Sequence, residues 1–147
     1  NSQAALALRE LGVVAATCYV EDDRANLAEL LSRQTGLPLA ITIYGNLPLM
    51  ISRMPLRGVK PDRPLLSDRG EGYRVDKKGG LTIVRSEKDF SLFGHLDELR
   101  SLGFRRLQID LSHCGPFSPE GRRVLEAFSR NEPVSGTSDF NYLQGMV

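Results

Sequence analysis

Carboxylates stand where three predicted strands end, and paired carboxylates are what general acid–base chemistry needs. Glu21 follows the apolar run 13–20, Asp68 follows Leu65-Leu66, and Asp110 lies near the end of the run 105–111. In a parallel α/β sheet, ligand-facing side chains collect at the edge formed by the carboxyl ends of the strands. Acid and base roles require two of these carboxylates to converge on one pocket, and the spacing alone leaves open which two.

Tyr44, Arg53 and Arg69 are the other polar candidates in the stretch 37–69. Tyr44 and Arg53 could bind an anionic or aromatic group, although a tyrosine in this position more often packs, with its hydroxyl hydrogen-bonded. Arg69 either faces a ligand together with Asp68 or forms an internal ion pair with it. Both alternatives stay open from the sequence.

His113 and Cys114 could act as a base and a thiol nucleophile at the end of a strand. Adjacent residues of a strand point to opposite faces, so a loop histidine and a packed thiol are the expected roles. The two histidines and two cysteines are spread out without metal-binding spacing, and we expect neither a zinc site nor an iron–sulfur cluster held by this chain alone. Cys18 and Cys114 lie in apolar surroundings, which is typical of reduced thiols in a cytoplasmic protein.

Nucleotide-binding signatures are absent from the chain. Gly70-Glu71-Gly72 links two extended pieces and does not open a helix, so an ATP or NAD enzyme has no support. The 19 basic and 18 acidic residues are mixed, so the net charge of +1 gives no general attraction to nucleic acid or anionic lipid. The one basic cluster is a solvated loop or an anion site and comprises Arg53, Arg57, Lys60 and Arg63.

Strands and helices are predicted to alternate, as in an α/β protein. The runs 13–20 and 39–44 are apolar without alternation, which is typical of parallel strands covered on both faces. A helix over 24–34, capped by Asp22 or Asp23 and ended by Gly36, joins them into a right-handed βαβ unit. Further helices are expected over 2–11, over 91–102 and from Ser118-Pro119 onward, with a strand over 105–111.

Residues 65–86 interrupt this alternation. Tyr73-Arg74-Val75 and the run 81–84 alternate polar and apolar side chains and flank Gly79-Gly80, which predicts an inserted β-hairpin. We expect residues 47–54 to form an extended segment across the end of the sheet and residues 136–142 to be mostly coil.

The length of 147 residues with 41% apolar composition fits one domain, or part of a larger one. No apolar run approaches the roughly 20 residues of a membrane helix, and the first residues lack the pattern of a signal peptide. We therefore expect a soluble, cytoplasmic protein. The helix beginning at Ser2 needs an upstream surface to bury its apolar stripe, so the chain is expected to be the C-terminal part of a longer protein.

Three segments, in order, resemble signatures of the collagenase-like, or U-thirty-two, peptidase family. They are Tyr44-Gly45-Asn46-Leu47-Pro48-Leu49-Met50-Ile51-Ser52, then Leu66-Ser67-Asp68-Arg69-Gly70 with Tyr73-Arg74-Val75, and Gly136-Thr137-Ser138-Asp139-Phe140-Asn141-Tyr142. The resemblance covers nearly the whole chain. It implies an α/β fold, a partial (β/α) TIM-type barrel with about the last three or four strands and an inserted hairpin.

The resemblance also implies a hydrolase that acts on protein or peptide substrates, since members are described as peptidases and some as collagenases. Carried over by position, Glu21 and Asp68 are the candidate catalytic residues. The candidate substrate-binding residues are Tyr44, Arg53, Arg69 and Asn141. The implied partner is the N-terminal part of the barrel.

Other members of the family act on transfer RNA, ribosomal RNA or ubiquinone and carry an iron–sulfur cluster on four cysteines. This chain has Arg53-Met54-Pro55 where members usually have a cysteine. The thioether of Met54 cannot replace a thiolate in such a cluster, so we expect no cofactor. The alternative function is therefore a cluster-free factor that modifies or binds RNA on the same barrel.

Overall fold

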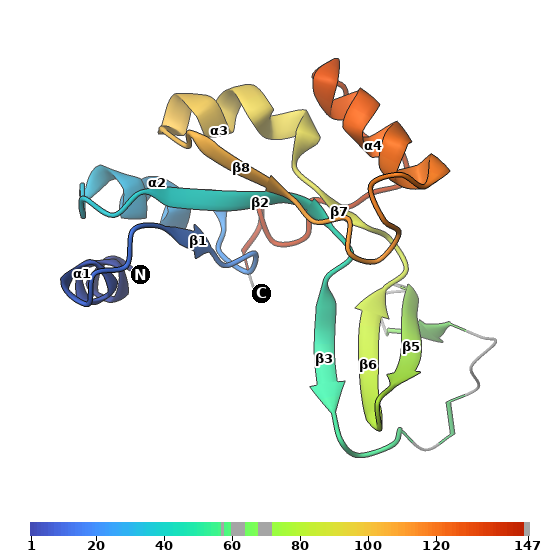
Figure 1. The fold of residues 1–147 in the computed structure, drawn as a ribbon. Helices are drawn as coiled ribbons and strands as arrows, with labels where there is room; N and C mark the ends of the chain where they lie inside the picture. The colour runs from blue at the N-terminus through green and yellow to red at the C-terminus, as the bar shows by residue number, and fades with distance from the viewer. Residues whose placement is uncertain (57, 60–63, 68–71, 146–147) are drawn as a thin grey trace.

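A parallel three-stranded arrangement around β2 (Leu39–Gly45) is the centre of the fold. The computed structural model describes residues 1–56, 58–59, 64–67 and 72–145 (Figure 1). Strands β1 (Ala16–Cys18) and β8 (Arg106–Ile109) pair with β2 in parallel, and Ala40 has partners in both, so they flank opposite edges. A short strand, β7 (Phe90–Ser91), pairs antiparallel with Tyr44 and Gly45 at the end of β2.

Helices connect these strands, and α2 and α4 begin where the sequence predicts them. In α2 (Arg24–Ser32) the Asp23 carboxylate accepts a hydrogen bond from the backbone of Asn26 at 2.8 Å, and in α4 (Pro119–Ser129) the Ser118 hydroxyl accepts one from Gly121 at 2.9 Å. Side-chain oxygens at these positions satisfy backbone donors that a helix leaves unpaired. The other helices are α1 (Ser2–Glu10), the 3₁₀ helix η1 (Phe93–His95) and α3 (Leu96–Leu102).

A second, antiparallel sheet is inserted between β2 and β7. Its strand order is β3-β6-β5-β4, with bounds β3 (Pro48–Ser52), β4 (Leu65–Leu66), β5 (Gly72–Lys78) and β6 (Leu81–Ser86). The predicted hairpin is present as β5 and β6, with Lys78 paired to Leu81 across Gly79-Gly80. Residues 47–54 do not cross the end of the first sheet, because β3 turns away from β2 and pairs with β6 (Figure 1).

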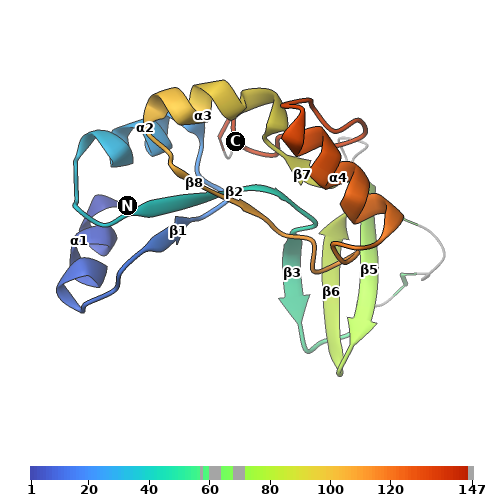
Figure 2. The same ribbon diagram turned by 45° about the horizontal axis from the view of Figure 1, so that its top comes forward.

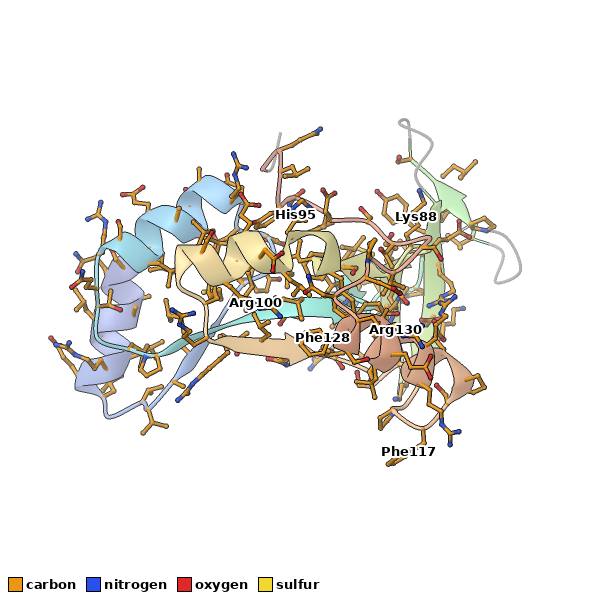
Figure 3. All side chains as sticks on the ribbon, turned by 90° about the horizontal axis from the view of Figure 1, so that it is seen from above. Lys88, His95, Arg100, Phe117, Phe128 and Arg130 are labelled. Carbon is orange, nitrogen blue, oxygen red and sulfur yellow. The ribbon has the colours of Figure 1, made fainter. Side chains whose placement is uncertain are left out.

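The core lies between the parallel sheet and the helices on one of its faces. Figure 2 shows α2 and α3 along this face, with the inserted sheet beyond the end of β2. Ile43, Leu99 and Val124 are fully buried here, and the Phe93 and Phe128 rings pack with centroids 5.5 Å apart. Figure 3 shows that Phe128 lies over this core while Phe117, before α4, lies at the periphery, where it is 84% exposed.

Among the described residues, the opposite face of the parallel sheet is only partly covered. Thr17 and Gln108 are exposed there, and the Thr17 hydroxyl donates to the Gln108 side-chain oxygen at 3.4 Å. The expectation that 13–20 is a strand covered on both faces is therefore wrong: β1 has three residues, and Val14 is 84% exposed. An edge strand with one open face buries only its helix-facing residues, here Cys18.

The predicted helices and strands are otherwise present, with shifted ends. The helix over 91–102 begins at Leu96, because Phe90–Ser91 pair with β2 and residues 93–95 form η1. Residues 133–145 are mostly coil, tied to the sheet by a bridge between Ser138 and Phe90. No helix in the described residues has the length and apolarity to cross a bilayer.

The β5–β6 turn gives a test of this fold. Gly80 has φ +76°, a conformation that costs an L-residue with a side chain roughly 1–2 kcal/mol. We expect Gly80→Ala to lower the free energy of unfolding by about 1 kcal/mol, measured by urea denaturation. Gly94→Ala is the control, since a Cβ there meets nothing within 4 Å and Gly94 lacks a positive φ. Equal free energies of unfolding for the two variants would contradict the positive φ assigned to Gly80.

Candidate functional site

Titratable side chains converge on one cavity, where the end of β2 meets the inserted sheet and the start of α4. This cavity, called here the Asp89 cavity, has a volume of about 330 Å³. Its lining residues are Tyr44, Arg74, Glu87, Asp89, His113, Glu120, Arg123, Ser135, Gly136 and Thr137. A larger cavity of about 450 Å³ between α1 and α2, lined partly by Asn1, Asn26 and Arg33, contains no histidine or cysteine. The Asp89 cavity is therefore the candidate functional site.

Asp89 contacts three other polar side chains at this cavity. Its Oδ2 accepts a hydrogen bond from the Tyr44 hydroxyl at 2.5 Å, and its Oδ1 accepts one from the Asn46 amide at 2.7 Å. Nε2 of His113 lies 3.6 Å from Oδ2. The carboxylate is 15% exposed, so its negative charge is held by these donors rather than by bulk water.

Asn46 connects Asp89 to the inserted sheet. This buried residue follows β2, and its backbone oxygen accepts a hydrogen bond from Arg85 of β6 at 2.6 Å. Its side-chain oxygen lies 3.5 Å from Nη2 of Arg74 on β5, at the limit of a hydrogen bond. Arg85 also pairs with Asp76 at 3.5 Å. The inserted sheet is thereby joined to the end of β2, and Arg74 is placed at the cavity.

A tight turn after β8 positions His113. The backbone of Asp110 donates to the Tyr44 carbonyl at 2.9 Å, and the Asp110 carboxylate accepts from the Ser112 backbone at 2.9 Å. The hydrogen bonds to Ser112 hold the pKa of Asp110 below its usual value. The Cys114 and Gly115 amides both donate to the Leu111 carbonyl, which closes the turn. Asp110, a carboxylate at a predicted strand end, thus has a structural role.

The start of α4 brings Glu120 and Arg123 to the same cavity. A Cβ at Gly121 would collide with the carbonyl oxygen of Gly115, so glycine at this position lets the helix pack closely on the preceding turn. As a result, a ring nitrogen of His113, the Cys114 sulfur and a Glu120 carboxylate oxygen all lie within 4.8 Å of one another. Adjacent residues of a strand would point to opposite faces, but His113 and Cys114 are not in a strand, because residues 112–114 form a turn.

This arrangement can transfer protons and bind an anion. The His113 imidazole, whose Nε2 lies 3.6 Å from Oδ2 of Asp89, is a candidate base, and the guanidinium groups of Arg74 and Arg123 can hold a negatively charged oxygen. The pKa of Tyr44 is raised by burial and by the hydrogen bond and charge of Asp89, so its hydroxyl stays protonated and donates to the carboxylate.

Of the predicted site residues, the structure brings Tyr44 to the cavity. Glu21 is exposed in the turn after β1 and is not among the lining residues. Arg53 is exposed directly after β3, and Asn141 lies in the C-terminal coil, where its carbonyl accepts from Gly145. Asp68 and Arg69, with the proposed ion pair between them, lie outside the described residues. Catalytic roles for Glu21 and Asp68 stay predictions.

Sequence reasoning missed Asp89 and Glu120 as site residues. Asp89 precedes the two-residue strand β7, which gives no periodic signal, and Glu120 occupies the first turn of α4, where an acidic residue is favoured for helix stability alone. Asn46 could have been found from the sequence, because it is a polar residue directly after the buried strand β2. His113 and Cys114 were singled out, but the pairing with Asp89 across 24 positions depends on the tertiary fold.

Comparisons with known proteins return no match. No protein-family model matches the chain, and neither a curated protein nor a solved structure is similar to it at the significance required. The function is therefore inferred from the geometry of the site and from the resemblance described above.

The Tyr44–Asp89 hydrogen bond gives a stability test. Tyr44→Phe removes a donor from a partly buried carboxylate, so we expect a loss of about 1–3 kcal/mol in the free energy of unfolding at neutral pH. Because the pKa of Tyr44 is raised in the folded chain, the stability it contributes is complete below its usual value of 10.0 and is lost as the pH rises above it. The difference between wild type and variant should shrink in that range.

Urea denaturation from pH 7 to pH 11 measures this difference. Tyr19→Phe is the matched control, since Tyr19 is 65% exposed and should leave stability nearly unchanged at each pH. A gap between wild type and Tyr44→Phe that stays constant up to pH 11 would contradict the assigned hydrogen bond.

The two cysteines are free, and Cys18 should react slowly with alkylating agents. Burial, aided by the charge of Asp22, raises the pKa of the Cys18 thiol from 9.0 to about 11, which reduces the reactive thiolate about 100-fold at neutral pH. In a Cys114→Ser chain we expect iodoacetamide to label Cys18 at least about 100-fold more slowly in buffer than in urea. Similar rates in the two conditions would show that Cys18 is not in the core.

Proposed function

We propose that this chain is a peptide hydrolase and that the Asp89 cavity is its active site. The observation that carries the proposal is the Asp89–His113 pair, in which both carboxylate oxygens are already held by neutral donors, Tyr44 and Asn46. A base whose orientation is fixed by a third group is the recurring arrangement for activating a nucleophile. The resemblance to the U-thirty-two peptidases supports the same substrate class.

In this proposal the nucleophile is a water molecule. Asp89 faces Nε2 of His113, which leaves Nδ1 to take a proton from the water as its oxygen attacks the peptide carbonyl carbon. The imidazolium then returns this proton to the leaving amine, and the C–N bond breaks. Arg74 and Arg123 supply positive charge for the carbonyl oxygen as it becomes negative, or for a substrate carboxylate.

We also propose that β1, β2 and β8 are successive strands of a TIM-type barrel. Each of these strands is followed by a helix, and the inserted sheet lies between β2 and α3 in the chain. The order of the three strands across the sheet is the same as their order in the sequence. Polar side chains on the open face and functional groups beyond the carboxyl ends of β2 and β8 support this architecture. The remaining part of the barrel would cover the face that carries Thr17 and Gln108.

The iron–sulfur cluster that some U-thirty-two family members carry does not fit the residues present here. Such a cluster needs four thiolates, whereas these 147 residues contain Cys18, buried on β1, and Cys114, in the turn after β8. The proposed hydrolysis therefore uses no step that depends on the cluster.

Hydrolysis of denatured collagen by the full-length protein tests the proposal. We expect His113→Gln to reduce kcat/KM by about 10²–10⁴-fold, because the base is lost. Asp89→Asn should reduce it and change the pH–rate profile, since the orienting charge is removed. Glu21→Gln separates this assignment from the prediction made from the sequence: Glu21 is exposed and outside the cavity, so the present proposal expects an unchanged rate, whereas a catalytic Glu21 would require a loss of activity. Activity that depends on Glu21 and not on His113 would overturn the assignment.

Unmodified transfer RNA, offered in parallel, distinguishes the alternative function. Absence of hydrolysis together with salt-sensitive RNA binding that weakens in Arg53→Ala would favour an RNA-binding or RNA-modifying factor and reject the peptidase.

A further inference from the structure

We infer that His113, Cys114 and Glu120 form a binding site for Zn²⁺. One nitrogen, one sulfur and one oxygen from these residues lie within 4.8 Å of one another although the side chains come from a turn and from the helix after it. Imidazole, thiolate and carboxylate are the three ligand types that zinc takes in proteins. The site goes beyond the proposed hydrolysis, because its existence does not depend on any catalytic step.

The spacing of the ligand atoms is close to that of a zinc site. Metal–ligand distances of about 2.0–2.3 Å in a tetrahedron place ligand atoms roughly 3.3–3.8 Å apart, so small rotations of the three side chains from their present positions would complete the site. Cys114 is half-buried and Glu120 is exposed in the first turn of α4, which gives both room for such rotations. A thiolate and a carboxylate together balance the charge of Zn²⁺.

Asp89 supplies the feature that separates this cluster from a chance group of polar residues. Its carboxylate lies 3.6 Å from Nε2 of His113 and is itself fixed by Tyr44 and Asn46. A zinc-bound histidine usually donates its other ring nitrogen to a carboxylate, which sets the tautomer and the ring orientation. Because Nε2 is the nitrogen 3.6 Å from Asp89, the inference assigns Nδ1 to the metal.

The backbone around the three residues is firmly held. The Leu111 carbonyl accepts from Cys114 and Gly115, and the contact of Gly121 with the Gly115 carbonyl fixes the start of α4 on this turn. Three protein ligands leave one tetrahedral position for water, as in zinc sites that exchange or react. Zinc binding would also withdraw the His113 ring from proton transfer, so metal binding and the proposed hydrolysis compete for this residue.

Titration of the purified full-length protein with Co²⁺, followed by competition with Zn²⁺, tests the site. Cobalt bound to Cys114 should give a thiolate-to-metal charge-transfer absorption at one equivalent per site, and Zn²⁺ should abolish it. Cys114→Ser should remove this absorption, while Cys18→Ser, the matched control at a core cysteine, should retain it. Absence of the absorption in wild type, or its persistence in Cys114→Ser, would overturn the inference.

Two further variants separate ligand loss from misfolding. Glu120→Gln changes an exposed side chain and should weaken Zn²⁺ binding at least about 10-fold, measured with a chromophoric chelator, with the thermal unfolding midpoint unchanged. Asp89→Asn should weaken it about 10–100-fold through the loss of the histidine's partner. Unchanged zinc affinity in both variants would overturn the site. All these readouts are independent of hydrolysis, so failure of the peptidase assay and failure of zinc binding are separate results.

Discussion

The hydrogen bonds to the Asp89 carboxylate are the interaction on which the rest of the structure depends. Through them Asp89 binds Tyr44, within β2, and Asn46, just after it. The same carboxylate lies 3.6 Å from the His113 ring in the turn after β8. A carboxylate with so little exposure is stable only when its charge is met by several donors. The same bonds therefore hold together the end of the parallel sheet and fix the groups that line the cavity.

The inserted sheet contributes to the cavity through polar contacts as well as through its strands. Arg85 reaches the backbone of Asn46, so the arginine-bearing face of the β5–β6 hairpin is anchored where β2 ends. Arg74 is the register partner of Arg85 and is consequently brought to the rim of the cavity. In this way an antiparallel sheet with its own strand order becomes one wall of a site whose other walls belong to the α/β unit.

The same residues serve the two proposals in different ways. As a proton acceptor, the His113 ring needs Asp89 to fix its orientation; as a metal ligand, it needs the same carboxylate to fix its tautomer. Cys114 and Glu120 are required only for the metal, because Cys114 does not line the cavity and no proton-transfer role is assigned to Glu120. Variants of Cys114 and Glu120 therefore test metal binding without testing the proposed hydrolysis.

Local signals in the sequence determined the elements: the caps at Asp23 and Ser118, the buried run of β2 and the Gly79-Gly80 turn follow from short-range hydrogen bonding, periodicity and backbone sterics. Tyr44 was found because it ends a buried strand. The tertiary structure alone decided that Asp89 meets Tyr44, 45 positions earlier in the chain, and that one face of β1 is open. Such contacts depend on how strands pair and helices pack, and no periodicity within one segment records the neighbour it will meet.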